Sequence, residues 1–135
     1  MIFGLRSIVL ISICTLAGCN NTPQRVSVCD IVADPESYYG VKVIVSGESI
    51  SHRHGTILAS KSCPEVGIVL KGNGDSEVDA FLSESFGVGV PAPPHDRRLF
   101  ATLTGSYNHF PGEYAEQAFV VARVNASQVV KISGQ

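Results

Sequence analysis

Alternation of apolar and polar residues is the clearest pattern in the first half of the chain. In VKVIVSGES, residues 41–49, Val41, Val43 and Val45 fall on one side of an extended strand, and the intervening residues fall on the other. Gly47, near the end of this segment, favours a bend or a bulge. Two shorter runs rich in β-branched residues, TILAS and VGIVLKG, follow the turn HRHG. The pattern therefore predicts three strands before residue 75.

The spacing of the apolar residues changes in DSEVDAFLSESFG, residues 75–87. These residues recur at the spacing of one helix face: Val78, Phe81, Leu82 and Phe86. Asp75 or Ser76 is suited to cap the start of the helix, and Gly87 is suited to end it. One short amphipathic helix is therefore predicted here.

Strand character returns after the glycine- and proline-rich segment GVGVPAPPHD. Residues 98–110 and 118–132 are rich in β-branched residues, and the second segment is long enough for two strands or one bent strand. The order of strands and helix then predicts a mainly β domain, a small five-stranded OB-like barrel with its helix between strands 3 and 4. The alternative is a small open α+β sheet with the helix on one face.

The N-terminal segment MIFGLRSIVLISICTLAGCNN has the layout of a secretory signal peptide. One cation, Arg6, precedes an apolar run that stops at the small residues Ala17 and Gly18. This run is about half as long as the roughly 20 residues that a membrane-spanning helix needs. We therefore expect residues 1–18 to act in targeting.

The sequence LAGC, at residues 16–19, resembles the lipobox of bacterial lipoproteins. The resemblance implies that residues 1–18 are removed, that Cys19 is lipidated, and that residues 19–27 tether a domain spanning residues 28–135. Two or more acyl chains hold a protein stably at a membrane. Asn20 resembles the pattern of lipoproteins sorted to the outer membrane, so we expect a lipid-anchored envelope protein there, facing the periplasm. An ordinary signal peptide that leaves Cys19 as a free thiol is the alternative.

The charge balance of the chain is mildly acidic. Ten Lys and Arg residues stand against 12 Asp and Glu residues, which gives a net charge of −2 at pH 7. Proteins recognise nucleic acids first through a basic surface, so we expect no nucleic-acid partner. The length of 135 residues suits one domain once the signal peptide is removed.

The four cysteines can be assigned on the basis of the lipoprotein resemblance. Cys14 leaves with the signal peptide and Cys19 takes the lipid, so Cys29 and Cys63 remain. Two thiols in an oxidising compartment most simply form one disulfide. We therefore expect a Cys29–Cys63 bridge.

A second resemblance concerns VCDIVADPESYYGVKVIVSGE, residues 28–48, taken together with Cys63 and Pro64. These residues resemble the opening of small bacterial envelope proteins with an OB-like domain, a resemblance that implies no activity or site residue. Within this segment, SVCDIVADPESYYG predicts a helical turn, with Pro35 opening a second turn and Gly40 leading into the strand.

Two loops of the predicted barrel carry the candidate ligand rim, since OB-folds bind ligands with the loops joining strands 1 to 2 and 4 to 5. The first loop contributes His52, Arg53 and His54. The second loop contributes Tyr107, His109, Phe110 and Tyr114, with Glu113 between the last two. Ordinary exposed loops are the alternative.

No catalytic motif is recognisable in the chain. It lacks a Gly-rich phosphate loop, HExxH and GxSxG, and the spacing of its glutamates does not pair them for acid–base work. We expect a non-catalytic binding or scaffold role without cofactor or resident metal, with the membrane and another envelope protein as partners. The alternative is a periplasmic metal-binding module that uses His52, His54 and His109, or that combines Cys63 with the first two.

Overall fold

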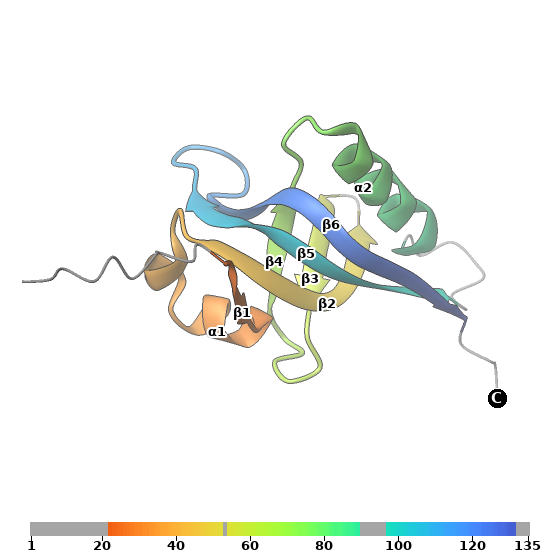
Figure 1. Ribbon diagram of the computed structural model, residues 1–135, viewed down its shortest axis with the longest axis horizontal. Helices are drawn as coiled ribbons and strands as arrows, with labels where there is room; N and C mark the ends of the chain where they lie inside the picture. Colours follow the sequence, from red (N-terminus) through yellow and green to blue (C-terminus); the bar gives the residue numbers. More distant parts are fainter. Residues whose placement is uncertain (1–21, 53, 90–96, 132–135) are drawn as a thin grey trace, which may run out of the picture.

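The computed structural model describes residues 22–52, 54–89 and 97–131, which form a six-stranded mixed sheet with two α-helices and a 3-10 helix (Figure 1). The strands are β1 (Gln24–Val26), β2 (Lys42–His52), β3 (Gly55–Ala59), β4 (Gly67–Lys71), β5 (Arg97–His109) and β6 (Gln117–Lys131). The helices are α1 (Val28–Ala33), η1 (Pro35–Tyr38) and α2 (Ser76–Gly89). The mainly β class is confirmed, although the sheet has six strands where five were predicted. The expected signal peptide and Cys19 lie outside the described residues.

Five of the six strands form a closed ring. β2 pairs with β3 on one side and with β5 on the other, and β4 and β6 complete the circuit. The β4–β6 contact is parallel and consists of only two residue pairs, Leu70 with Phe119 and Lys71 with Val120. In the chain, α2 comes between the third and fourth strands of the ring, as predicted.

β2 can pair with both β3 and β5 because the chain bends near Gly47. Residues as far as Ser49 pair with β5, and residues from Glu48 onward pair with β3. A Cβ atom on Gly47 would collide with the carbonyl oxygen of Ala59 in β3. Only glycine permits this close approach, which accounts for the predicted bend.

Side chains from alternate strand positions fill the interior of the ring. Phe119, Leu58 and Leu103 are fully buried there. Val43 and Val45 also point inward as predicted, but Val41 is 45% exposed and precedes β2, so its predicted place on the buried face is wrong. The cause is a turn, because the Val41 N–H donates to the Tyr38 carbonyl oxygen (3.0 Å) and the alternation starts only after it.

α2 packs over one end of the ring, against β2, β5 and β6 (Figure 1). Asp75 caps it as predicted, since its Oδ1 accepts hydrogen bonds from the N–H groups of Glu77 (2.9 Å) and Val78 (3.3 Å). Val78 and Phe81 are buried, and the side chain of Phe86 lies outside the described part. The helix continues to Gly89, because a glycine at position 87 permits a stop without forcing one. Within the described residues, no helix is long and apolar enough to span a bilayer.

The helical turns predicted ahead of the first long strand are present as α1 and η1. Ser27 caps α1, because its Oγ accepts from the Asp30 N–H (2.9 Å) while the Asp30 carboxylate accepts from the Ser27 N–H (3.1 Å). Hydrogen bonding of the Asp30 carboxylate to the side chain of Ser27, and to its backbone N–H, holds the pKa of Asp30 below its ordinary value. η1 starts at Pro35, as predicted.

The predicted Cys29–Cys63 disulfide is confirmed, with the two Cα atoms 5.7 Å apart. Cys29 belongs to α1, and Cys63 lies in the loop between β3 and β4. Val28 and Ile31 of the same helix are fully buried against the ring. The bridge therefore fastens α1 to the ring beside its apolar contact, and it occupies the sulfur that the alternative metal site required.

β1 lies within the segment that the sequence analysis assigned to the tether. Its residues pair in parallel with the start of β2, Gln24 with Val43 and Val26 with Val45. A strand of three residues offers too little alternation to recognise in the sequence. It forms because β2 presents a free edge to the incoming chain, so the ordered domain starts before residue 28.

Residues 117–131 form one long strand, β6, which settles the choice between one strand and two. Its register against β5 shifts between Thr102 and Leu103 and again between Thr104 and Gly105. A Cβ atom on Gly105 would collide with the Val120 carbonyl oxygen. These irregularities bend the β5–β6 pair around the core.

Candidate functional site

Ring closure brings the two predicted rim loops to the same region of the molecule. β3 starts at the β2–β3 turn, and its Thr56 pairs with Leu70 near the end of β4. Leu70 in turn pairs with Phe119 at the start of β6, directly after the β5–β6 loop. The β2–β3 turn, the end of β4 and the β5–β6 loop are therefore neighbours.

The β5–β6 loop is held by its own backbone. The Phe110 N–H donates to the Glu116 carbonyl oxygen (2.6 Å), and the Glu113 N–H donates to the Phe110 carbonyl oxygen (3.2 Å). Gly112 has a φ of +80°, in the left-handed region that favours glycine. This geometry fixes where the loop presents its aromatic side chains.

One aromatic contact joins the two loops directly. The rings of His54 and Tyr114 stack with their centroids 5.6 Å apart. Tyr114 nevertheless remains 84% exposed. It is therefore the most accessible large apolar side chain of this region.

Lys71, at the end of β4, contacts the same loop twice. Its Nζ lies 2.7 Å from Glu113 Oε2 and 4.0 Å from the centroid of the Phe110 ring. The two ion-pair side chains are 42% and 53% exposed, so this pair contributes at most about 1 kcal/mol. Lys71 carries no signal in the sequence, because only the parallel β4–β6 contact brings it to this loop.

A separate group of aromatic side chains surrounds Tyr39. Its ring stacks on Tyr107 (6.0 Å between centroids) and on His109 (5.9 Å). Gln117 Nε2 donates to the Tyr39 hydroxyl (2.7 Å), and the Tyr107 hydroxyl donates to Gln117 Oε1 (3.1 Å). Burial, and to a lesser extent the neighbouring Tyr39, raises the pKa of the Tyr107 hydroxyl above its ordinary value.

The structure thus divides the predicted rim into two clusters. The loop cluster contains His54, Lys71, Phe110, Glu113 and Tyr114. The tyrosine cluster contains Tyr39, Tyr107, His109 and Gln117. Arg53 and the side chain of His52 lie outside the described residues. In the sequence, the repeated tyrosine in SYYG could have pointed to Tyr39 as a site residue, whereas no pattern marks Gln117.

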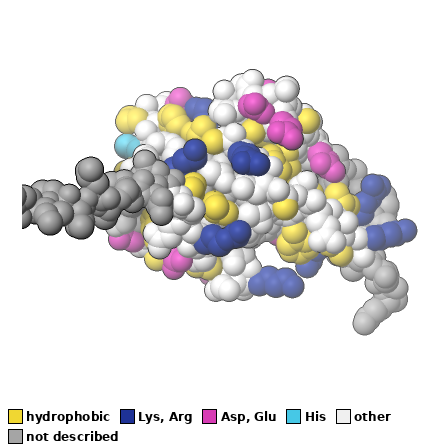
Figure 2. Space-filling model, in the orientation of Figure 1, with side chains coloured by type: hydrophobic (Ala, Val, Ile, Leu, Met, Phe, Trp, Pro, Cys, Tyr) yellow, Lys and Arg dark blue, Asp and Glu magenta, His cyan; other side chains and the backbone are white. Residues whose placement is uncertain are grey.

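Ring stacking, a cation–π contact and an ion pair make up the contacts of these clusters. Across residues 22–52, 54–89 and 97–131, no group of three or more His, Cys, Asp or Glu side chains is placed to hold a metal ion. His54 and His109 instead stack on different tyrosines. Exposed aromatic side chains such as Tyr114 are enriched at protein contact surfaces. On the face drawn in Figure 2, both acidic and basic side chains are present.

Comparison with known proteins found no relative of this chain. No family model, no curated protein and no solved structure matches the chain.

Proposed function

We propose that this chain is a lipid-anchored lipoprotein of a bacterial cell envelope, in which the β domain has a non-catalytic binding or scaffold role. The Cys29–Cys63 disulfide carries the proposal. Disulfides form and persist in oxidising compartments such as the periplasm. The LAGC sequence at residues 16–19 supports lipidation of Cys19, and Asn20 supports the outer membrane as its destination.

The tether between the anchor and the domain is short. Only residues 20–23 separate Cys19 from β1, a length that spans at most about 18 Å when fully extended. A lipid on Cys19 would therefore keep β1 and the adjoining α1 close to the membrane. The domain would meet partners that lie at the same membrane or within a short distance of it.

The order of elements supports an OB-like domain. Five strands close into a ring, with α2 between the third and fourth of them in the chain, as in an OB-fold. β1 is then an addition outside the ring. OB-folds bind ligands with the loops that correspond to the β2–β3 turn and the β5–β6 loop, which supports the loop cluster as the contact surface.

The anchor is tested by labelling in a bacterial host. We expect the wild-type protein to incorporate labelled palmitate and to partition into the detergent phase, because each buried methylene of an acyl chain contributes about 0.8 kcal/mol to membrane binding. Cys19→Ser should abolish both properties, whereas the control Cys29→Ser should retain them. Recovery of unlabelled wild-type protein in the aqueous phase would refute the anchor.

The binding role is tested by photocrosslinking in the native envelope. A benzophenone side chain at position 114 should give a light-dependent adduct of higher mass, because Tyr114 is exposed at the loop cluster. The matched control is the same side chain at Ser62, in the β3–β4 loop, which lies away from the β5–β6 loop (Figure 1). Equal yields at both positions, or none at 114, would argue against the loop cluster. Zinc binding at nanomolar Kd that His54→Ala abolishes would instead favour the metal-binding alternative.

A further inference from the structure

A groove on the outer face of the sheet is separate from both clusters. A hollow of about 620 Å³ is lined by β2, β5 and β6, and a second of about 460 Å³ is lined by β2, β5 and the segment after β3. The two hollows share Gly47 and Phe100, so they adjoin. We refer to them together as the sheet groove.

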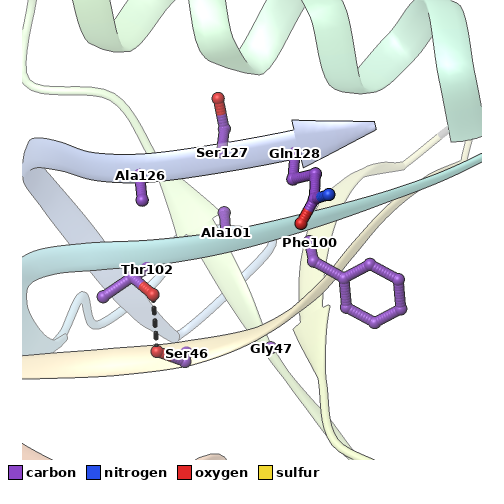
Figure 3. Close-up of a pocket in the computed structure, with 8 residues that line it drawn as sticks. All are labelled: Ser46, Gly47, Phe100, Ala101, Thr102, Ala126, Ser127 and Gln128. Atoms are coloured by element: carbon purple, nitrogen blue, oxygen red, sulfur yellow. Dashed lines mark hydrogen bonds between the residues drawn. The ribbon is translucent and has the colours of Figure 1, made fainter. Parts of the chain in front are cut away.

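The strand register places the side chains of the groove side by side. Phe100 in β5 pairs with Glu48 in β2 and with Gln128 in β6, and Thr102 pairs with Ser46. Leu99 and Ala101 are buried in the core, so the residues that alternate with them point outward. Figure 3 shows the Phe100 ring extending from β5 on the side where Gln128 reaches across the strand.

The polar groups of the groove are hydroxyls, an amide, one ion pair and, at one end, the ammonium group of Lys61. Ser46 Oγ lies 2.7 Å from Thr102 Oγ1, and each hydroxyl keeps capacity for a further hydrogen bond. Glu48 Oε1 lies 3.4 Å from Arg98 Nε, with the two side chains 22% and 46% exposed. The groove therefore combines a partly exposed aromatic ring with hydrogen-bond donors and acceptors. Within it, the charge of Glu48 offsets that of Arg98.

This composition excludes several ligand classes. A peptide cannot add as a strand to β5, because both edges of β5 are already paired, with β2 and with β6, along the groove. A polyanion would need a predominantly basic surface, whereas Glu48 neutralises Arg98 and leaves Lys61 at one end. An acyl chain would require a deep enclosed cavity, whereas both hollows are open to solvent and the hydroxyls of Ser46 and Thr102 contribute to the lining.

We infer that the sheet groove binds an uncharged oligosaccharide, with the apolar face of one sugar ring on Phe100 and its hydroxyls on Gln128, Thr102 and the Glu48–Arg98 pair. The groove follows β5 from Arg98 to Thr102, about 13 Å, which is longer than a single sugar ring. This inference rests on the binding role proposed above, but it does not depend on the lipid anchor or on the loop cluster.

The test uses the full lipidated protein in micelles of lauryldimethylamine oxide, a detergent without a sugar headgroup. Cellohexaose, maltohexaose and the uncharged hexa-N-acetylchitohexaose are each titrated by calorimetry. We expect saturable one-to-one binding of at least one of them. Phe100→Ala should weaken that binding at least about tenfold, which corresponds to roughly 1.4 kcal/mol.

Three further variants keep the result interpretable. Phe100→Tyr retains an aromatic ring and should retain binding, and Gln128→Ala, at an exposed position, should weaken it without unfolding the protein. Val41→Ala, at an exposed apolar position between η1 and β2 that lines neither hollow, should leave the affinity unchanged.

Absence of binding by all three hexasaccharides, or binding that Phe100→Ala and Gln128→Ala leave unchanged, would overturn the inference. Palmitate labelling and crosslinking at position 114 report on the proposed function separately. If both succeed while sugar binding fails, only the assignment of the sheet groove is wrong.

Discussion

Phe119→Ala is expected to lower the free energy of unfolding by about 3–5 kcal/mol, the cost of emptying a buried phenylalanine site. Phe119 is fully buried, and it faces Tyr107 across the β5–β6 pair. It also belongs to one of the two residue pairs by which β6 meets β4. The substitution therefore leaves a cavity at the β4–β6 contact, which closes the ring through only two residue pairs.

Urea unfolding followed by far-ultraviolet circular dichroism measures this effect. Phe119→Leu, which retains most of the side-chain volume, should lose much less stability. Phe110→Ala, in the partly exposed β5–β6 loop, is the matched control and should cost far less than Phe119→Ala. Equal losses for Phe110→Ala and Phe119→Ala would show that the ring does not depend on packing at its closure.

Cys29→Ser is expected to destabilise the oxidised protein by roughly 3–4 kcal/mol, following the chain-entropy model for a loop of this length. The bridged cysteines are 34 positions apart, and their bond joins α1 to the β3–β4 loop. Without it, the unfolded chain regains the freedom of that loop. The buried contacts of Val28 and Ile31 must then hold α1 in place alone.

Thermal unfolding with and without dithiothreitol provides the measurement. The reductant should lower the melting temperature of the wild type to about that of Cys29→Ser. The double variant Cys29→Ser/Cys63→Ser should match the single variant and should not respond to the reductant. If dithiothreitol leaves the melting temperature of the wild type unchanged, the bridge does not stabilise the protein.

The long strands and α2 could be predicted because their signals are local. Alternating burial of Val43 and Val45 requires only the period of a strand, and the burial of Val78 and Phe81 requires only the period of a helix. The Asp75 cap is likewise a local signal, whereas the predicted helix end at Gly87 was wrong. The Cys29–Cys63 pair followed from cysteine count and compartment rather than from geometry. Each of these features depends on residues near one another in the chain or on a simple count.

The rim could be predicted only in part, because its contacts depend on ring closure. The meeting of the two loops followed from the proposed fold, and the His54–Tyr114 stack agrees with it. Lys71 reaches Phe110 only through the parallel β4–β6 contact, and Tyr39 draws Tyr107 and His109 into another cluster. No local pattern encodes such partners.

By itself, the sequence determined where β2 to β6 and α2 form, since periodicity and capping act along the chain. The cysteine count, taken with the lipoprotein resemblance, indicated which two cysteines pair. Only the tertiary structure decided that Gln24–Val26 become a strand, because their partner is a free edge of β2. It likewise decided the sheet groove, because Phe100 and Gln128 become neighbours through the register of β5 and β6. Register is set by the packing of the whole ring, and residues far apart in the chain acquire a common surface only when that ring closes.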